Sequence, residues 1–308
     1  MRHILRSQQF DRANIERLFR ATDILKNAFK SKVGRAKYSY ALFGRLMFTI
    51  FYQPSTRTRI SFGAAASHLG MKVIGTENAR EFSSAIKGET LEDTIEVLCH
   101  YLPDVIVLRH HEAGAAERAA LVAEYHGVSI INAGDGKGQH PTQALLDLYT
   151  IEHELGRIDG LTVVLGGDLA NGRTARSLAY LLTKFERVKL IFVSPPDLRI
   201  GVDIKNHLEE HGVRFEETEL LLEALEKADV VYWTRVQNDP ESYVRLSAPY
   251  RISSNEMAHF KDNAILMHPL PRVDEIAKEV DSDPRAAYFR QAGYGMYVRM
   301  ALLQQILT

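Results

Sequence analysis

The chain has 308 residues, of which 45% are hydrophobic and 25% are charged, which is the composition of an ordinary globular protein. This length exceeds one typical hydrophobic core, so we expect two domains. Because 38 basic and 39 acidic residues leave a formal net charge of −1, the composition argues against bulk electrostatic capture of nucleic acid or of an anionic membrane. Any bound anion must be held by a local cluster.

Cysteine content and hydropathy exclude further classes of site. The single cysteine, Cys99, rules out an intramolecular disulfide and a structural zinc site built on paired cysteines, and its apolar neighbours Val97 and Leu98 predict a buried thiol. The first residues, MRHILRSQQFDR, contain no apolar run of a signal peptide, and no stretch of about 18 apolar residues occurs. We therefore expect a cytoplasmic protein that binds neither nucleic acid nor membrane.

Short apolar runs alternate with helical stretches in the first half of the chain. A first helix has apolar residues at helical spacing from Phe10 to Phe29, and Asp11 is its predicted N-cap. The next predicted elements are strands over 46–52, 73–74, 105–108 and 128–131, alternating with helices over 60–69, 90–101 and 115–125. Such alternation predicts a parallel α/β sheet.

The same alternation of strands and helices begins again at Leu161. Strands are predicted over 161–165, 189–193, 230–233 and 264–267, with helices near 173–185, 203–211 and 219–227, a connecting helix over 142–155 and a final helix over 288–307. We therefore predict an α/β protein with two doubly wound parallel-sheet domains joined by bridging helices. The C-terminal helix is expected to pack back on the N-terminal domain. The expected domains are 1–141 with 291–308, and 142–290.

The segment Ser55-Thr56-Arg57-Thr58-Arg59 lies between a predicted strand and a predicted helix. The N-terminus of a helix carries a partial positive charge. Without a bound anion, two arginines in its first turn would be repelled by this charge and would destabilise the helix. A bound anion reverses that effect, because hydroxyls, backbone N–H groups and guanidinium groups then converge on it. We therefore predict a phosphate site; the alternative is a polar helix cap with solvated arginines.

Two further polar segments follow predicted strands, where open α/β sheets place their ligands. Arg109 follows the strand 105–108, and the loop 132–139 leads to His140 at a helix start. The helix dipole disfavours an imidazolium there, so a neutral His140 can donate one hydrogen bond to a carbonyl oxygen and polarise it. If His140 occurred alone, a helix cap would be the better interpretation. Because Arg109 and the phosphate segment are also present, we favour a role for His140 in polarising a substrate carbonyl.

Taken in order, these motifs resemble the aspartate/ornithine carbamoyltransferase family. The resemblance runs from Phe51 to Ala301. The segments that carry it are STRTR at 55–59, KGET at 87–90, NAGDG at 132–136, HPTQ at 140–143, GRT at 172–174, TRVQ at 234–237 and HPLPRVDE at 268–275. Any one of these segments could arise by chance, whereas their occurrence in this order, at separations of the size of a domain, is specific to the family.

The resemblance implies a role for each matching residue. Carbamoyl phosphate would be bound by Ser55, Thr56, Arg57, Thr58, Arg109, His140, Gln143 and the backbone of Leu270 and Pro271. Of these, Arg57, Thr58, Arg109 and His140 form the implied catalytic set. The carboxylates of aspartate would be bound by Lys87, Arg173, Arg235 and Gln237. Neither a metal nor a cofactor is implied, since an amine attacks a carbonyl and phosphate leaves.

The segment around Arg235 bears on which amine accepts the carbamoyl group. The ornithine branch of the family typically has Ser-Met-Gly and His-Cys-Leu-Pro segments, where this chain has Arg235-Val236-Gln237 and His268-Pro269-Leu270-Pro271. A cation suits the second carboxylate of a dicarboxylate and would repel the ammonium group of ornithine. We therefore expect transfer to the α-amine of L-aspartate, giving N-carbamoyl-L-aspartate and phosphate in pyrimidine biosynthesis.

Alternatives to this function stay open at the level of sequence. One is a carbamoyltransferase for a different amine; another is a catalytically weakened family member acting as a subunit, because Gln53 and Gly63 stand where the family usually has glutamate. A nucleotide site at 166–172 is the weakest alternative, since G-x-G-x-x-G spacing is missing and no acidic residue ends the next strand. Adjacent His110 and His111 predict a solvated turn rather than a metal site.

The resemblance also implies a homo-oligomer, expected to be a trimer with shared active sites. Ser83 and Lys87, on the loop 81–87, would reach into the site of a neighbouring subunit, and Ser84 is the alternative to Ser83. The sequence leaves open whether a regulatory subunit or a dihydroorotase partner also binds.

Overall fold

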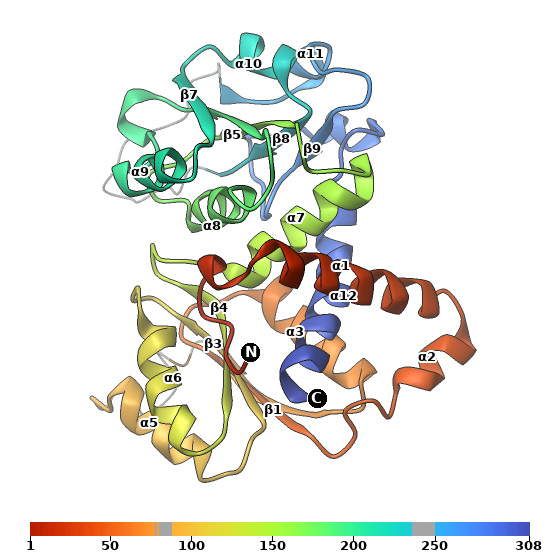
Figure 1. The fold of residues 1–308 in the computed structure, drawn as a ribbon, viewed down its shortest axis with the longest axis vertical. Helices are drawn as coiled ribbons and strands as arrows, with labels where there is room; N and C mark the ends of the chain where they lie inside the picture. The colour runs from red at the N-terminus through yellow and green to blue at the C-terminus, as the bar shows by residue number, and fades with distance from the viewer. Residues whose placement is uncertain (78, 80–87, 236–249) are drawn as a thin grey trace. The chain divides into compact units, whose positions relative to one another are not determined.

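The computed structural model describes residues 1–77, 79, 88–235 and 250–308, and it divides into two compact units (Figure 1). Unit 1 comprises 1–145 and 294–308, and unit 2 comprises 146–293. Each unit contains one parallel sheet with helices packed against it, so the predicted α/β class is confirmed.

The sheet of unit 1 has the strand order β2-β1-β3-β4, and all neighbours pair in parallel. Its strands are β1 (Leu46–Phe51), β2 (Lys72–Glu77), β3 (Val105–His110) and β4 (Ser129–Asp135). The central strand β3 is buried from Val105 to Leu108, because helices cover both faces of the sheet. This double coverage explains why these strands appear in the sequence as continuous apolar runs rather than as alternating patterns.

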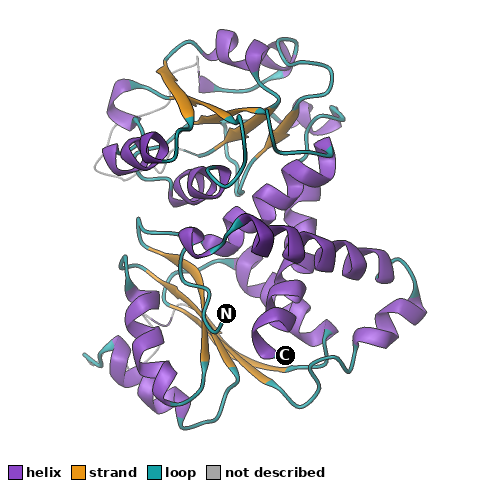
Figure 2. Cartoon of the chain, in the orientation of Figure 1, coloured by secondary structure: helices purple, strands orange, loops and turns teal. Residues whose placement is uncertain are grey.

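Different helices cover the two faces of this sheet (Figure 2). The described helices that lie wholly within unit 1 are α1 (Arg12–Ala28), α2 (Lys32–Tyr38), α3 (Thr56–His68), α5 (Leu91–Cys99) and α6 (Ala115–Tyr125). Helices α5 and α6 share one apolar cluster with side chains such as Ile106 and Leu108 of β3. Alternate side chains of a strand point to opposite faces, so this cluster defines the α5–α6 face.

The helix starts in unit 1 follow from local capping. The carboxylate of Asp11 accepts a hydrogen bond from the Asn14 N–H at 2.6 Å, which confirms Asp11 as the N-cap of α1. The hydroxyl of Thr90 accepts from the Asp93 N–H at 3.1 Å and starts α5 in the same way. These bonds satisfy N–H groups that have no partner inside the helix.

The C-terminal helix α12 (Tyr288–Leu307) returns to unit 1, as predicted. Nη1 of Arg299 donates to the hydroxyl of Ser61 at 2.9 Å, and the ring of Tyr297 makes an edge contact with Phe29. The boundaries between the units fall inside α12 and inside α7 (Pro141–Leu155), so both helices contribute residues to both units.

The sheet of unit 2 has the order β7-β6-β5-β8-β9, again with parallel neighbours. Its strands are β5 (Thr162–Gly166), β6 (Lys189–Val193), β7 (Arg214–Thr218), β8 (Val230–Trp233) and β9 (Ile265–Met267). The remaining helices are α8 (Arg173–Leu182), α9 (Val202–Glu210), α10 (Leu221–Lys227) and α11 (Ser254–Met257). Within the described residues, no helix is both long and apolar enough to cross a membrane.

Several elements differ from the sequence predictions. Strand β7 was not predicted, because Arg-Phe-Glu-Glu-Thr lacks an apolar run; it lies at the edge of the sheet and none of its side chains is fully buried. The short helices α2 and α11 were also missed. Strand β4 continues to Asp135, so residues 132–135, predicted as loop, are buried strand.

The predicted solvated turn at His110 is wrong. His110 is the last residue of β3, it is 5% exposed, and its ring packs between those of Tyr52 and His111. Burial, reinforced by the nearby His111, lowers the pKa of His110 to about 4. The sequence showed two adjacent polar residues but not that the strand extends far enough to bury the first.

Candidate active site

The candidate residues of unit 1 lie where its strand order reverses. Strand β1 pairs with β2 on one side and with β3 on the other, so the chain leaves its carboxyl end in one direction and later returns in the other. Phe51 of β1 stands opposite Arg109 of β3, and the Tyr52 N–H donates to the Arg109 carbonyl at 2.8 Å. Open α/β sheets bind ligands at such a switch point. The Ser55 segment follows β1 directly, so topology brings it to the same edge as Arg109.

The predicted phosphate segment forms the start of α3. Ser55 is the N-cap, yet its side chain makes no capping bond to the helix; its hydroxyl donates instead to Oγ1 of Thr58 at 3.0 Å. Thr58 is buried, whereas Thr56 and Arg57 are exposed. The first turn of α3 contains no acidic residue. This helix start therefore has the hydroxyls, the exposed guanidinium group and the dipole that suit a phosphate.

Arg109 is held by the neighbouring strand. Its Nη1 donates to the carbonyl of Ala133 at 3.0 Å, and Ala133 is fully buried in β4. This contact depends on the extension of β4 beyond the predicted strand end. It fixes the guanidinium group of Arg109 at the carboxyl edge of the sheet.

His140 stands at the start of α7, as predicted. It is 4% exposed, and its carbonyl accepts hydrogen bonds from the N–H groups of Gln143 and Ala144 at 3.0 and 3.1 Å. The preceding loop is braced by the buried Asp135, whose carboxylate accepts from the N–H groups of Gln139 at 2.7 Å and Gly114 at 2.9 Å. Asp135 is therefore a bracing residue that the sequence analysis did not single out.

In unit 2, the switch point lies between β5 and β8. Gly166 of β5 stands opposite Trp233 of β8, and the hydroxyl of Thr234 donates to the Gly166 carbonyl at 2.9 Å. Arg173 begins α8, which follows β5, and the exposed Arg235 lies two residues after the end of β8. The two predicted carboxylate-binding arginines thus come from the segments that follow the two central strands.

The glycines of the loop after β5 have a packing role. A Cβ atom at Gly166 would overlap the ring of Trp233, and Gly167 has φ of +97°, with the Thr234 carbonyl where a side chain would begin. The close approach of β5 to β8 therefore accounts for both glycines, and no dinucleotide-binding role is needed to explain them. Trp233 is fully buried, as predicted.

The segment after β9 carries Leu270 and Pro271. Leu270 has φ of +54°, which is unusual for a residue with a side chain. Its N–H donates to Nδ1 of His268 at 2.8 Å, and Nε2 of His268 lies 2.9 Å from Oε1 of Glu275. The other Glu275 oxygen accepts from the Val273 N–H at 3.0 Å. Strained backbone that the surroundings hold in place is frequent at functional sites.

Protonation of this buried pair follows from its contacts. Burial lowers the pKa of His268, although the neighbouring Glu275 opposes the shift. Burial alone would raise the pKa of Glu275, but hydrogen bonds from His268 and from backbone N–H groups outweigh it and lower the pKa. Since Nδ1 accepts from Leu270, the neutral ring carries its proton on Nε2, facing the carboxylate.

The segment 268–275 is also tied to the interior of unit 2. The His268 N–H donates to Oε1 of Gln291 at 2.9 Å, and Nε2 of Gln291 donates to the buried Asp147 at 2.6 Å. The hydroxyl of Tyr232 on β8 donates to the same carboxylate at 2.8 Å. The supporting roles of Glu275, Gln291 and Asp147 were missed, because a single sequence does not show which polar groups meet in a core.

The predicted site residues Ser83, Lys87 and Gln237 lie outside the described residues, as does the alternative Ser84. Those that the structure describes fall into two groups. Ser55 to Thr58, Arg109, His140 and Gln143 belong to unit 1, and Arg173, Arg235, Leu270 and Pro271 belong to unit 2. The substrate roles given to them stay predictions.

Comparison with protein families identifies both units. The model "Aspartate/ornithine carbamoyltransferase, carbamoyl-P binding domain" matches residues 2–153, and the model of the Asp/Orn binding domain matches residues 159–306. The chain belongs to the aspartate/ornithine carbamoyltransferase family.

Individual relatives and solved structures agree with this membership. Aspartate carbamoyltransferase 3, chloroplastic, of Pisum sativum is 52% identical over 99% of this chain and 77% of its own length. The multifunctional protein CAD of Squalus acanthias is 45% identical over 99% of this chain and 13% of its own length. Aspartate transcarbamoylase from Trypanosoma cruzi, in complex with N-(phosphonacetyl)-L-aspartic acid, has a TM-score of 0.91 and 40% identity, covering 100% of this chain and 96% of that one.

Proposed function

We propose that this chain transfers the carbamoyl group of carbamoyl phosphate to the α-amine of L-aspartate, giving N-carbamoyl-L-aspartate and phosphate. The observation that carries the acceptor assignment is the position of Arg173 and Arg235 after the two central strands of unit 2. Two guanidinium groups suit the two carboxylates of aspartate, and each can bind a carboxylate through two parallel hydrogen bonds. The Pisum sativum relative is named for this activity, and the Trypanosoma cruzi neighbour binds a phosphonate-aspartate compound.

In the proposed reaction, the helix start at Ser55 to Thr58 binds the phosphate of carbamoyl phosphate. Thr58, Arg109 and His140 donate hydrogen bonds to the carbonyl oxygen, on which negative charge develops when the amine attacks the carbon. The C–N bond forms, the bond from carbon to the bridging oxygen breaks, and the phosphate leaves. The amine is itself the nucleophile, and the departing phosphate takes the proton that the amine loses, so the reaction needs neither a protein nucleophile nor a protein base.

Carbamoyl transfer from labelled carbamoyl phosphate tests the proposal directly. The purified chain should carbamoylate aspartate and leave ornithine unreacted. Arg57→Ala should abolish carbamoyl phosphate binding, measured by calorimetry, with an unchanged circular dichroism spectrum. Arg35→Ala, which removes an exposed arginine from α2, is the matched control and should bind normally. Transfer to ornithine instead of aspartate would refute the acceptor assignment, and intact binding by Arg57→Ala would refute the phosphate site.

We also propose that the chain forms a homotrimer with shared active sites, in which Ser83 and Lys87 serve a neighbouring subunit. Exposed apolar side chains of unit 1 support this proposal. Ile60 of α3 is 59% exposed beside a pocket lined by Gly63, Ala64 and Val73. Ile74 of the edge strand β2 is 61% exposed on the other face of the sheet, because it pairs with Phe48 of the α5–α6 face. Exposed apolar groups of this kind favour burial against another subunit.

Sedimentation velocity tests this assembly. The wild-type chain should sediment at three times the monomer mass, and Ile74→Lys should shift it toward the monomer. Val33→Lys is the control, because Val33 lies on α2 and is 81% exposed. A wild-type monomer at micromolar concentration would overturn the proposal.

A further inference from the structure

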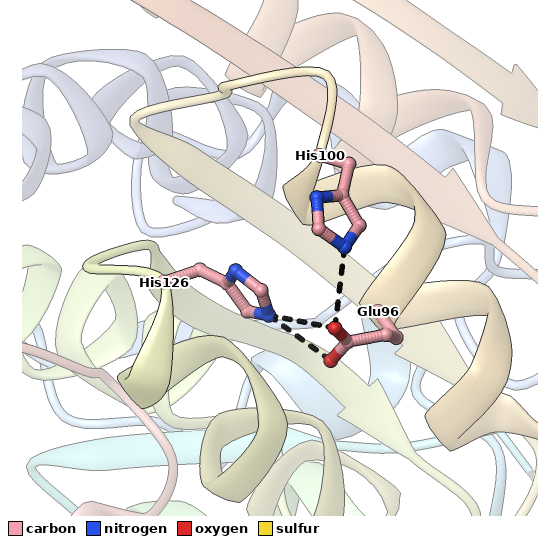
Figure 3. Close-up of side chains that lie close together, drawn as sticks. All are labelled: Glu96, His100 and His126. Atoms are coloured by element: carbon pink, nitrogen blue, oxygen red, sulfur yellow. Dashed lines mark hydrogen bonds and ion pairs between the residues drawn. The ribbon is translucent and has the colours of Figure 1, made fainter.

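The C-terminal ends of α5 and α6 bring two histidines and a glutamate together on the surface of unit 1 (Figure 3). Nε2 of His126 lies 3.0 Å from both carboxylate oxygens of Glu96, and Nε2 of His100 lies 3.4 Å from Oε1. The three side chains point toward one another in Figure 3, where the dashed lines from His100 and His126 meet at the carboxylate of Glu96. None of them belongs to the site described above.

The spacing of these atoms fits a transition-metal ion. Zinc bonds to nitrogen and oxygen of about 2.0–2.1 Å in a tetrahedral site place neighbouring ligand atoms about 3.3–3.4 Å apart. The ligand atoms of Glu96, His100 and His126 all lie within 4.8 Å of one another, and two of their separations are 3.0 and 3.4 Å. Small side-chain rotations therefore suffice to turn three nitrogen and oxygen atoms onto one ion.

The electrostatics of the surrounding helices also favour a cation. His100 is the C-cap of α5 and His126 is the C-cap of α6, so two helix ends of negative dipole converge on this cluster. The last turns of both helices contain no lysine or arginine.

The scaffold beneath the cluster is well packed, while the cluster itself is accessible. Ile95 and Cys99 of α5 pack with Ala119 and Ala123 of α6 in one buried apolar cluster. Above it, the side chains of His100 and Glu96 are 68% and 48% exposed, and that of His126 is 23% exposed. An ion can therefore reach the ligands, and the two helices that supply them are already packed.

We propose that Glu96, His100 and His126 bind a divalent transition-metal ion of the zinc class, with water completing the coordination shell. Helices α5 and α6 run antiparallel to the strands that follow them, so their C-terminal ends lie at the edge of the sheet opposite Arg109. The ion is therefore remote from the substrate residues of unit 1. Its effect is to fasten α5 to α6 and so stabilise the domain that carries the phosphate segment.

A titration of the chelator-treated chain with zinc sulfate tests the proposal. The wild type should bind zinc, and its melting temperature should rise with zinc concentration, because the ion binds the folded state. His100→Ala/His126→Ala should lose this site, with binding at least about tenfold weaker and no zinc-dependent rise. Cobalt, used as a spectroscopic probe, should give visible absorption bands of a tetrahedral site in the wild type and none in His100→Ala/His126→Ala.

A second histidine cluster supplies the matched control. His207 and Glu210 lie on α9 and His211 is its C-cap, and Nδ1 of His211 already contacts the His207 carbonyl at 2.8 Å. His207→Ala/His211→Ala should keep the zinc-dependent rise in melting temperature and the cobalt bands. Identical zinc titrations of the wild type and of the His100→Ala/His126→Ala variant would overturn the proposal and leave only a surface ion-pair cluster. Loss of zinc binding in the control variant alone would overturn it as well.

Discussion

His268 and Glu275 form a buried pair in unit 2, with Nε2 and Oε1 2.9 Å apart and side chains that are only 1% and 4% exposed. The same imidazole accepts the N–H of Leu270 through Nδ1 at 2.8 Å. The ring thus connects a buried carboxylate to the backbone that the family resemblance assigns to the carbamoyl group. Glu275 is therefore expected to position Leu270 rather than to contact the substrate.

The first prediction concerns Glu275. Glu275→Ala removes the carboxylate beside Nε2 of the buried His268 and the acceptor of the Val273 N–H, which should lower the free energy of unfolding by about 1–3 kcal/mol. The KM for carbamoyl phosphate should rise, because Leu270 loses its support. Glu275→Gln keeps an acceptor oxygen and should recover much of both losses. Urea unfolding and steady-state kinetics measure the two effects, with the exposed Glu279→Ala as control. Wild-type stability of Glu275→Ala would refute the bracing role.

The second prediction concerns the close packing of β5 against β8. Gly166→Ala introduces a methyl group that overlaps the ring of Trp233, so the free energy of unfolding should fall by about 1–3 kcal/mol. Gly63→Ala provides the opposite case, because nothing lies within 4 Å of its added Cβ atom inside α3. That change should stabilise the chain by about 0.5–1 kcal/mol. Chemical denaturation measures the change in the free energy of unfolding of each variant, which should be negative for Gly166→Ala and positive for Gly63→Ala. Equal changes would contradict the packing argument.

The third prediction concerns His140, the buried residue at the start of α7. His140→Ala removes one donor to the developing oxyanion and should lower kcat about 10²–10³-fold, while circular dichroism stays unchanged. His259→Ala, at an exposed ion pair with Glu226, is the control and should keep full activity. An undiminished kcat for His140→Ala would show that the residue serves only as the helix cap.

The fourth prediction is a pH dependence of stability at His110. Its pKa is about 4 in the folded chain and 6.5 in the unfolded one, so between these values only the unfolded chain binds the proton. The free energy of unfolding should therefore fall as pH drops from 6.5 to 4, by about 3 kcal/mol from this residue, with no further loss below 4.

His110→Asn isolates this contribution. The Asn side-chain oxygen can accept the Glu112 N–H as Nδ1 of His110 does at 3.1 Å, but it does not titrate. Urea unfolding at pH 7 and at pH 4.5 should give a smaller difference for the variant than for the wild type. His68→Asn, at an exposed histidine of α3, is the control and should keep the wild-type difference. If the free energy of unfolding of His110→Asn depended on pH as strongly as that of the wild type, His110 would not be the source of this dependence.

The sequence by itself determined the α/β class, the return of the C-terminal helix and most of the elements. Apolar runs and helical periods are local signals, so the strand 189–193 and the helix 115–125 were predicted to the residue. The family motifs carry the substrate assignments because their residue types are already explicit in the chain. Elements without such signals were missed, such as the charged edge strand β7.

Only the tertiary structure decided what surrounds each functional group. The strand orders place Arg109 opposite Phe51 and bring the segments after β5 and β8 to one edge of the sheet of unit 2. The burial of His110 and the pairing of His268 with Glu275 depend on contacts between distant or extended segments. Such contacts follow from packing, because a polar residue looks the same in a sequence whether water or another buried group satisfies it.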